Sequence, residues 1–173
     1  MKNSIKIFCV LLVAIGCFCT AGAQTKTDKK AAKSDEITRL VTDRNFVFNA
    51  TDVTPLRGGN RTLTSEYDLI VSKDTIAAYL PYFGQAYLAN YGSTDNGIKF
   101  TWTNFTYKET PDKKGSREIL ITPGDKNISD ANAVQYLRLF ISSNGYAFLQ
   151  ITNMNRDPIS FNGTIEPKKP KGI

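Results

Sequence analysis

The 173-residue sequence contains no histidine. Histidine is the commonest general base in enzymes and the commonest metal ligand among the side chains. Its absence excludes Ser-His-Asp and Cys-His catalytic arrangements and the zinc sites that use histidine ligands. G-x-G-x-x-G and P-loop motifs are missing as well, so no nucleotide site is indicated. We therefore expect no cofactor and no metal, and we favour a protein that is not an enzyme.

Cysteine is confined to the N-terminus, at Cys9, Cys17 and Cys19. Residues 1–6 carry two lysines and no acid, residues 7–20 form an almost unbroken apolar run, and Ala21-Gly22-Ala23 follows as a small-residue site. This order is typical of a secretory signal peptide, residues 1–23, that is cleaved near Ala23. We therefore predict a periplasmic or secreted protein whose mature chain has no thiol and no disulfide.

A lipid anchor is the alternative. Ala14-Ile15-Gly16-Cys17 resembles a bacterial lipobox, in which the cysteine is lipidated and becomes the first residue. No later segment approaches the roughly 18 apolar residues that a membrane-spanning helix needs, so we expect no membrane span.

Basic residues outnumber acidic ones, 22 against 16, but the excess lies at the two ends. Residues 24–34 form a lysine-rich segment that we expect to be a flexible leader, and residues 166–173 form a Lys/Pro tail. The remaining chain, 37–165, is close to neutral. A basic pI therefore does not indicate a nucleic-acid partner.

Hydropathy patterns predict one β-rich domain over residues 35–165. Ser34-Asp35-Glu36 is a plausible helix start, and apolar residues at helical spacing predict a short amphipathic helix from Asp35 to Arg44. The rest alternates apolar and polar residues in short runs separated by turn residues. Residues 62–71 are expected to form one strand, and 134–141 and 146–151 a hairpin buried on both faces by a second layer. The predicted fold is mainly β with one N-terminal helix (α+β), an antiparallel β-sandwich or partly open barrel of about eight strands.

Carboxylates are the remaining candidates for catalysis. Glu66 and Asp68 are two residues apart on one expected strand face, and Asp74 follows in the next turn. A pair of carboxyl groups about 5–10 Å apart in one pocket is the requirement for glycoside hydrolysis. A carboxylate-dependent glycan hydrolase is therefore the alternative function, although polar residues on an alternating strand are usually only solvated.

The most unusual segment, residues 79–92, concentrates aromatic side chains and is interrupted by proline and glycine. Exposed rings form stacking platforms for sugars and contacts for proteins, whereas rings on a long connection can also fold back and plug one end of a barrel. No lysine or arginine lies between Lys73 and Lys99, which argues against a nucleic-acid surface. The candidate ligand- or partner-binding residues are Tyr79, Tyr82, Phe83, Tyr87 and Tyr91.

Four motifs resemble those of domain-of-unknown-function family 4251, exported proteins of Bacteroidota. They are Leu80-Pro81-Tyr82-Phe83-Gly84, Gly97-Ile98-Lys99-Phe100, Asn144-Gly145-Tyr146-Ala147, and Arg156 with Ile159-Ser160-Phe161-Asn162-Gly163. The resemblance covers residues 37–165 and implies a small envelope protein, without an established activity or site. Together these observations favour an exported, non-enzymatic binding or scaffold module for a small ligand, a glycan or an envelope protein.

Overall fold

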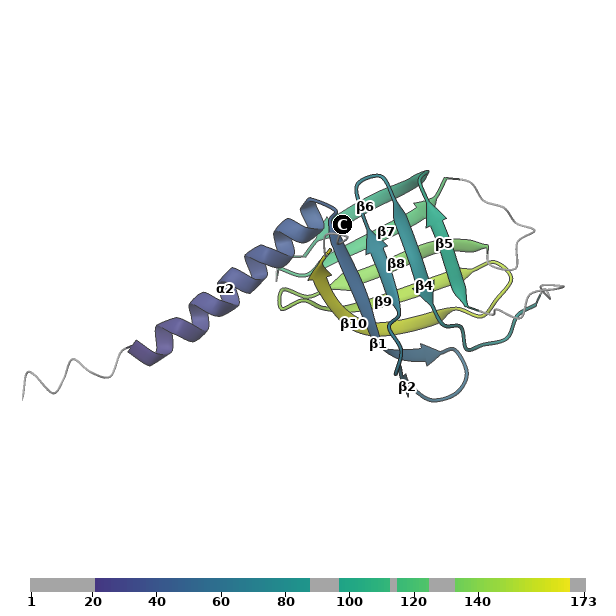
Figure 1. The fold of residues 1–173 in the computed structure, drawn as a ribbon, viewed down its shortest axis with the longest axis horizontal. Coiled ribbons are helices and arrows are strands. Elements are labelled where there is room, and N and C mark those ends of the chain that lie inside the picture. The colour runs from purple at the N-terminus through teal and green to yellow at the C-terminus, as the bar shows by residue number, and fades with distance from the viewer. Residues whose placement is uncertain (1–20, 88–96, 113–114, 125–132, 169–173) are drawn as a thin grey trace, which may run out of the picture.

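The computed structural model of the protein describes residues 21–87, 97–112, 115–124 and 133–168, and the three cysteines lie outside these ranges. One helix, α2 (Ala21–Thr42), precedes the strands and extends away from them (Figure 1). Within the described ranges, no helix is long and apolar enough to cross a membrane.

The helix is longer than predicted, because it begins at Ala21 and takes in the segment expected to be a flexible leader. After Gly22 this segment contains neither glycine nor proline and is rich in lysine and alanine, which are strong helix formers. This segment needs no apolar face of its own to become helical, because it continues the later turns of α2, which pack against the strands. Ile37 and Val41 are buried and anchor that end of α2 against the strands.

In the part of the chain that the structure describes, ten antiparallel strands form a single sheet in the order β5-β4-β3-β1-β10-β9-β8-β7-β6, with the short β2 paired to β1. The strands are β1 (Phe46–Pro55), β2 (Arg61–Thr62), β3 (Asp68–Val71), β4 (Ile76–Leu80), β5 (Ile98–Trp102), β6 (Phe105–Pro111), β7 (Arg117–Pro123), β8 (Val134–Ile141), β9 (Tyr146–Asn153) and β10 (Ile159–Pro167).

The sheet curls into a partly open barrel, and this decides between the two predicted architectures. Its edge strands β5 and β6 are separated in the chain only by residues 103–104. The long strand β1 pairs with β10 over almost its whole length and with β3 over its first half. In Figure 1, β4 and β5 cross in front of β8, β9 and β10, and the core lies between these two parts of the same sheet.

Alternate side chains of each strand fill the barrel, as the period of two requires. Phe46, Phe48 and Phe161 are the largest fully buried side chains. At one end of the barrel, Ile37 of α2 packs against the turn between β8 and β9 at Gly145. The guanidinium of Arg44 lies 4.3 Å from the ring centroid of Tyr107 on β6. The helix therefore covers one end of the barrel with its C-terminal half.

Two local predictions are wrong. Residues 62–71 do not form one strand: β2 ends at Thr62, and β3 begins only at Asp68, so Glu66 lies on the connection between them. The hairpin of β8 and β9 is central in the sheet, but no second layer covers its outer face among the described residues. Phe140 and Phe148 are partly exposed there, 39% and 36%, because the barrel presents only one face of each strand to the core.

Candidate functional site

A groove of about 570 Å³ lies on the outer face of β1 and β3 and brings together the carboxylates of two distant segments. We call it the carboxylate groove. Its polar and aromatic lining consists of Asn49, Thr64, Ser65, Glu66, Tyr67, Asp68, Glu166 and Lys168. The chain places these residues together because β1 pairs with β3 on one side and with β10 on the other.

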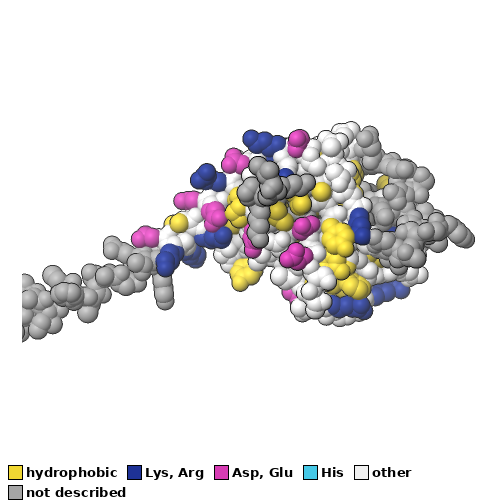
Figure 2. All heavy atoms as spheres, in the orientation of Figure 1, with side chains coloured by type: hydrophobic (Ala, Val, Ile, Leu, Met, Phe, Trp, Pro, Cys, Tyr) yellow, Lys and Arg dark blue, Asp and Glu magenta, His cyan; other side chains and the backbone are white. Residues whose placement is uncertain are grey.

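Strand register extends this groove toward β5. Asn49, Asp68, Tyr79 and Lys99 are successive partners across β1, β3, β4 and β5. Directly opposed residues in antiparallel strands project to the same face, so these four side chains form a row on the outside of the barrel. Figure 2 shows acidic side chains beside a hydrophobic patch on this face, with basic side chains at its border.

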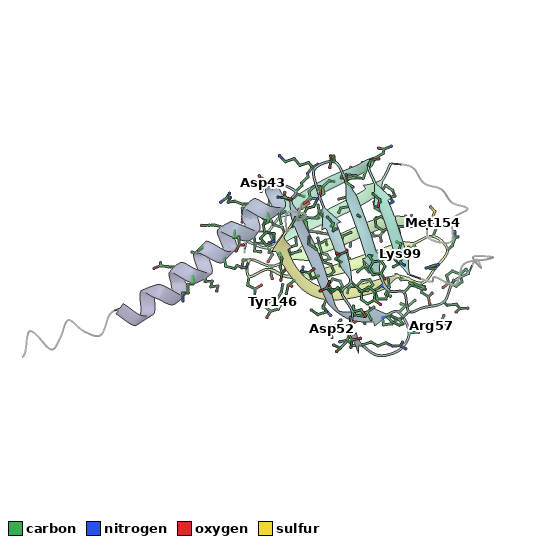
Figure 3. The ribbon with its side chains drawn as sticks, viewed as in Figure 1. Asp43, Asp52, Arg57, Lys99, Tyr146 and Met154 are labelled. Carbon is green, nitrogen blue, oxygen red and sulfur yellow. The ribbon has the colours of Figure 1, made fainter. Side chains whose placement is uncertain are left out.

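Two tyrosines form the aromatic part of the site. Tyr67 lines the groove, and its ring stacks on that of Tyr79 with centroids 5.6 Å apart and planes at 25°. The ammonium of Lys99, labelled in Figure 3, lies 4.7 Å from the ring centroid of Tyr79. Tyr79 therefore supports the ring of Tyr67 from the side away from β1, and it remains 48% exposed.

The carboxyl group of Asp68 is partly buried in the groove. Burial raises the pKa of the Asp68 carboxyl, and the nearby negative charge of Glu66 raises it further. Glu66 and Asp68 thus line a common pocket, which is one part of the condition that the hydrolase alternative sets. Asp74 does not line this groove. It lies in the turn between β3 and β4, where the hydroxyl of Thr75 donates a hydrogen bond to its carboxylate at 3.1 Å.

The predicted aromatic residues fall into two environments. Tyr82 and Phe83 are half-buried and pack against the core, at the end of the barrel opposite α2. The Tyr82 hydroxyl donates to the backbone carbonyls of Gln85, at 2.9 Å, and Asp157, at 3.2 Å. Burial and the carboxylate of Asp157 raise the pKa of Tyr82 to about 12. These contacts are those of a side chain that holds a loop in place.

Tyr87 is exposed, yet its hydroxyl is engaged as a donor to the Asp157 carboxylate. This hydrogen bond raises the pKa of Tyr87. The backbone of the same segment pairs with the β9–β10 connection, from Tyr87 N–H to the Asn155 carbonyl at 2.8 Å and from Asp157 N–H to the Gln85 carbonyl at 3.0 Å. Tyr91 lies outside the described residues. The five predicted binding residues therefore lie in three places: the outer face of the barrel, the loop that closes its end, and a segment outside the described residues.

A second groove, of about 710 Å³, lies on the outer face of β8 and β9 beside the β6–β7 hairpin. Phe140 and Phe148 contact one another in it, with ring centroids 6.2 Å apart, and the lining includes Tyr146 and Arg117. Sequence reasoning missed it, because the apolar residues of this hairpin were assigned to a second layer. The described residues contain no group of three or more Asp, Glu, His or Cys arranged to hold a metal ion.

Comparison with known proteins identifies the family of this chain. The family model of the domain of unknown function DUF4251 matches residues 28–165. The chain belongs to the DUF4251 family. The crystal structure of a DUF4251 family protein from Bacteroides eggerthii shares the fold, with a TM-score of 0.52 and 17% identity, over 80% of this chain and 91% of that one. No curated protein matches the sequence.

The match of the family model confirms the resemblance that the four motifs indicated. The structure shows where residues of these motifs lie. Tyr82 belongs to the loop that closes the end of the barrel opposite α2, and the guanidinium of the buried Arg156 lies 4.9 Å from its ring centroid. Lys99 reaches the tyrosine stack. No sequence pattern indicated that Tyr67 and Asn49 belong to the site, because each becomes part of it only through the pairing of β1, β3 and β4.

Proposed function

We propose that this DUF4251 protein is an exported envelope module that binds a glycan in the carboxylate groove. The observation that carries the proposal is that Tyr67, which lines the groove with Asn49, Glu66 and Asp68, stacks on the ring of Tyr79 beside the groove. Sugar rings present apolar C–H faces that pack on aromatic rings, and their hydroxyls pair with carboxylates and amides. A volume of about 570 Å³ is in the range of small-ligand sites, roughly 300–1,000 Å³.

Tyr79→Ala tests this function. Loss of the supporting ring is expected to weaken glycan binding about tenfold, corresponding to roughly 1.4 kcal/mol, while Tyr79→Phe retains most of the affinity. Affinity electrophoresis through polysaccharide gels, followed by titration calorimetry with oligosaccharides, measures the change. Tyr146→Ala is the matched control, since Tyr146 is exposed on β9 and lies outside the carboxylate groove. If Tyr146→Ala weakens binding and Tyr79→Ala does not, the groove on β8 and β9 is the site and this proposal is wrong.

A glycan hydrolase is the second candidate, and the shared pocket of Glu66 and Asp68 with the raised pKa of Asp68 favours it. A carboxyl with a raised pKa is suited to act as the general acid. The same oligosaccharides discriminate the two functions: shorter products that form with the protein and disappear in Glu66→Gln, with binding retained, establish the hydrolase.

Export is part of the proposal and rests on the charge and hydropathy pattern of residues 1–23. Expression of the full chain in its bacterial host followed by N-terminal sequencing is expected to find Gln24 as the first residue. Cleavage there removes only the first three residues of α2. A lipid-modified N-terminus at Cys17, abolished by Cys17→Ala, would establish the anchored form in its place.

A further inference from the structure

The carboxylate groove continues around the outside of the barrel. Glu166 lines both this groove and a hollow of about 280 Å³ beside it. Tyr146 lines the same hollow and also the groove of about 710 Å³ on β8 and β9. Because each neighbouring pair of depressions shares a lining residue, the three form one path on the outer face of the barrel, from Tyr67 to Tyr146 and beyond. We call it the cross-strand track.

Strand register shows where the track runs. Four residues are successive partners across β3, β1, β10 and β9, namely Asp68, Asn49, Thr164 and Tyr146. Directly opposed residues project to the same face, so these side chains form a row on the outside of the barrel. Neighbouring strands lie about 4.8 Å apart, so the row is roughly 14 Å long. A disaccharide does not cover this row, whereas a longer chain of sugars can contact both of its ends.

Tyr146 provides a second aromatic ring at the far end of the row. It is labelled in Figure 3 and is 67% exposed, the most exposed of the large hydrophobic side chains that the structure describes. Its backbone is held in place, because its N–H donates to the side-chain oxygen of Asn144 at 3.3 Å and its carbonyl accepts from the Ser142 hydroxyl at 2.7 Å. A tyrosine on a fixed backbone offers a large contact area at a low cost in conformational entropy.

We propose that the ligand is a linear polysaccharide bound along the cross-strand track, with one sugar packed on Tyr67 and a later sugar of the same chain packed on Tyr146. The inference rests on the proposed glycan-binding function and adds the length of the ligand. Between the two rings, Asn49, Thr164 and Glu166 present amide, hydroxyl and carboxylate groups to the sugar hydroxyls. Once one sugar is bound, the contact of a second sugar on the same chain is intramolecular. The affinity therefore increases with chain length until both rings are covered.

A length series tests the proposal by titration calorimetry, with linear oligomers of glucose and of N-acetylglucosamine from the disaccharide to the octasaccharide. The affinity of the unsubstituted protein is expected to rise about tenfold from the disaccharide to the hexasaccharide and then to level off. Tyr146→Ala should leave the affinity for the disaccharide unchanged and lower that for the hexasaccharide about tenfold. For short oligosaccharides this variant therefore remains a control, since only long chains reach the ring. Tyr79→Ala should weaken the binding of both lengths alike, since every chain uses Tyr67.

Two further variants separate the track from a change in the fold. Thr164→Arg places a long side chain in the hollow between the two rings, and it should abolish the gain from chain length while the disaccharide binds as before. Tyr87→Ala is the matched control and should keep the full length dependence, since Tyr87 is an exposed tyrosine that lines none of the three depressions. A thermal melt and the disaccharide affinity of each variant report whether the carboxylate groove is intact.

The outcomes distinguish this inference from the function on which it rests. Equal affinities for the disaccharide and the hexasaccharide would leave glycan binding in place and show that the polysaccharide inference is wrong. A length dependence that survives both Tyr146→Ala and Thr164→Arg would mean that the chain leaves the carboxylate groove by another path, which also overturns the inference. If no oligomer of either series binds, the glycan-binding function and the inference are both wrong.

Discussion

Gly163→Ala is expected to lower the free energy of unfolding by about 3 kcal/mol, a large part of the 5–15 kcal/mol that stabilises a domain of this kind. A Cβ added to Gly163 would lie 2.0 Å from the backbone carbonyl oxygen of Asn49 and 2.8 Å from the ring of Phe48. The first of these atoms belongs to the neighbouring strand, so β1 and β10 would have to separate. Urea unfolding followed by tryptophan fluorescence measures the loss through Trp102.

The close approach at Gly163 arises where the barrel bends. Gly163 is paired with Ala50, and the register of β1 against β10 shifts at the next residue, Thr51. The hydroxyl of Thr51 donates to the Asn162 carbonyl at 3.2 Å across this bulge. A bulge with an opposing glycine sharpens the twist of the two strands and lets a sheet curl into a barrel.

Gly59→Ala is the control for that prediction. No atom lies within 4 Å of a Cβ at Gly59, and its backbone is outside the left-handed region. Alanine there removes only freedom of the unfolded chain, so stability should stay unchanged or rise by about 0.5 kcal/mol. If the two substitutions change the free energy of unfolding equally, a clash with the Asn49 carbonyl is not the reason that residue 163 must be glycine.

Much of the barrel follows from local patterns. Ile98, Phe100 and Trp102 alternate with polar residues, and this period of two correctly predicts β5. The hairpin of β8 and β9 was predicted from two largely apolar runs joined by a turn that ends in Gly145, which has a positive φ. Alternation identifies a strand because each strand faces the core with one side only.

The site depends on contacts that no local pattern encodes. Tyr67 immediately precedes β3, which starts at Asp68, and it both packs against the core and stacks on Tyr79 of β4. Whether Glu66 and Glu166 share a groove depends on both β3 and β10 pairing with β1, although the two residues are far apart in the chain. Such pairings are chosen by the packing of the whole barrel, and a single sequence does not reveal them.

The double substitution Tyr82→Ala/Phe83→Ala is expected to lower the free energy of unfolding by about 4 kcal/mol, the cost of truncating two half-buried aromatic side chains that pack on the core. The guanidinium of Arg61 lies 4.9 Å from the Phe83 ring centroid, and that of the buried Arg156 lies at the same distance from Tyr82. Removing the rings therefore opens the end of the barrel and exposes a charge that is now covered.

Two measurements distinguish this structural role from the ligand platform that the sequence suggested. Tyr82→Phe removes only the hydroxyl that binds the Gln85 and Asp157 carbonyls, and it should cost about 1–2 kcal/mol. Calorimetry with the oligosaccharides should show unchanged binding by this variant, because the carboxylate groove lies on the outer face of β1 and β3. A double variant that unfolds like the unsubstituted protein but no longer binds a glycan would instead place the ligand at the loop, and the Tyr67–Tyr79 stack would then serve stability alone.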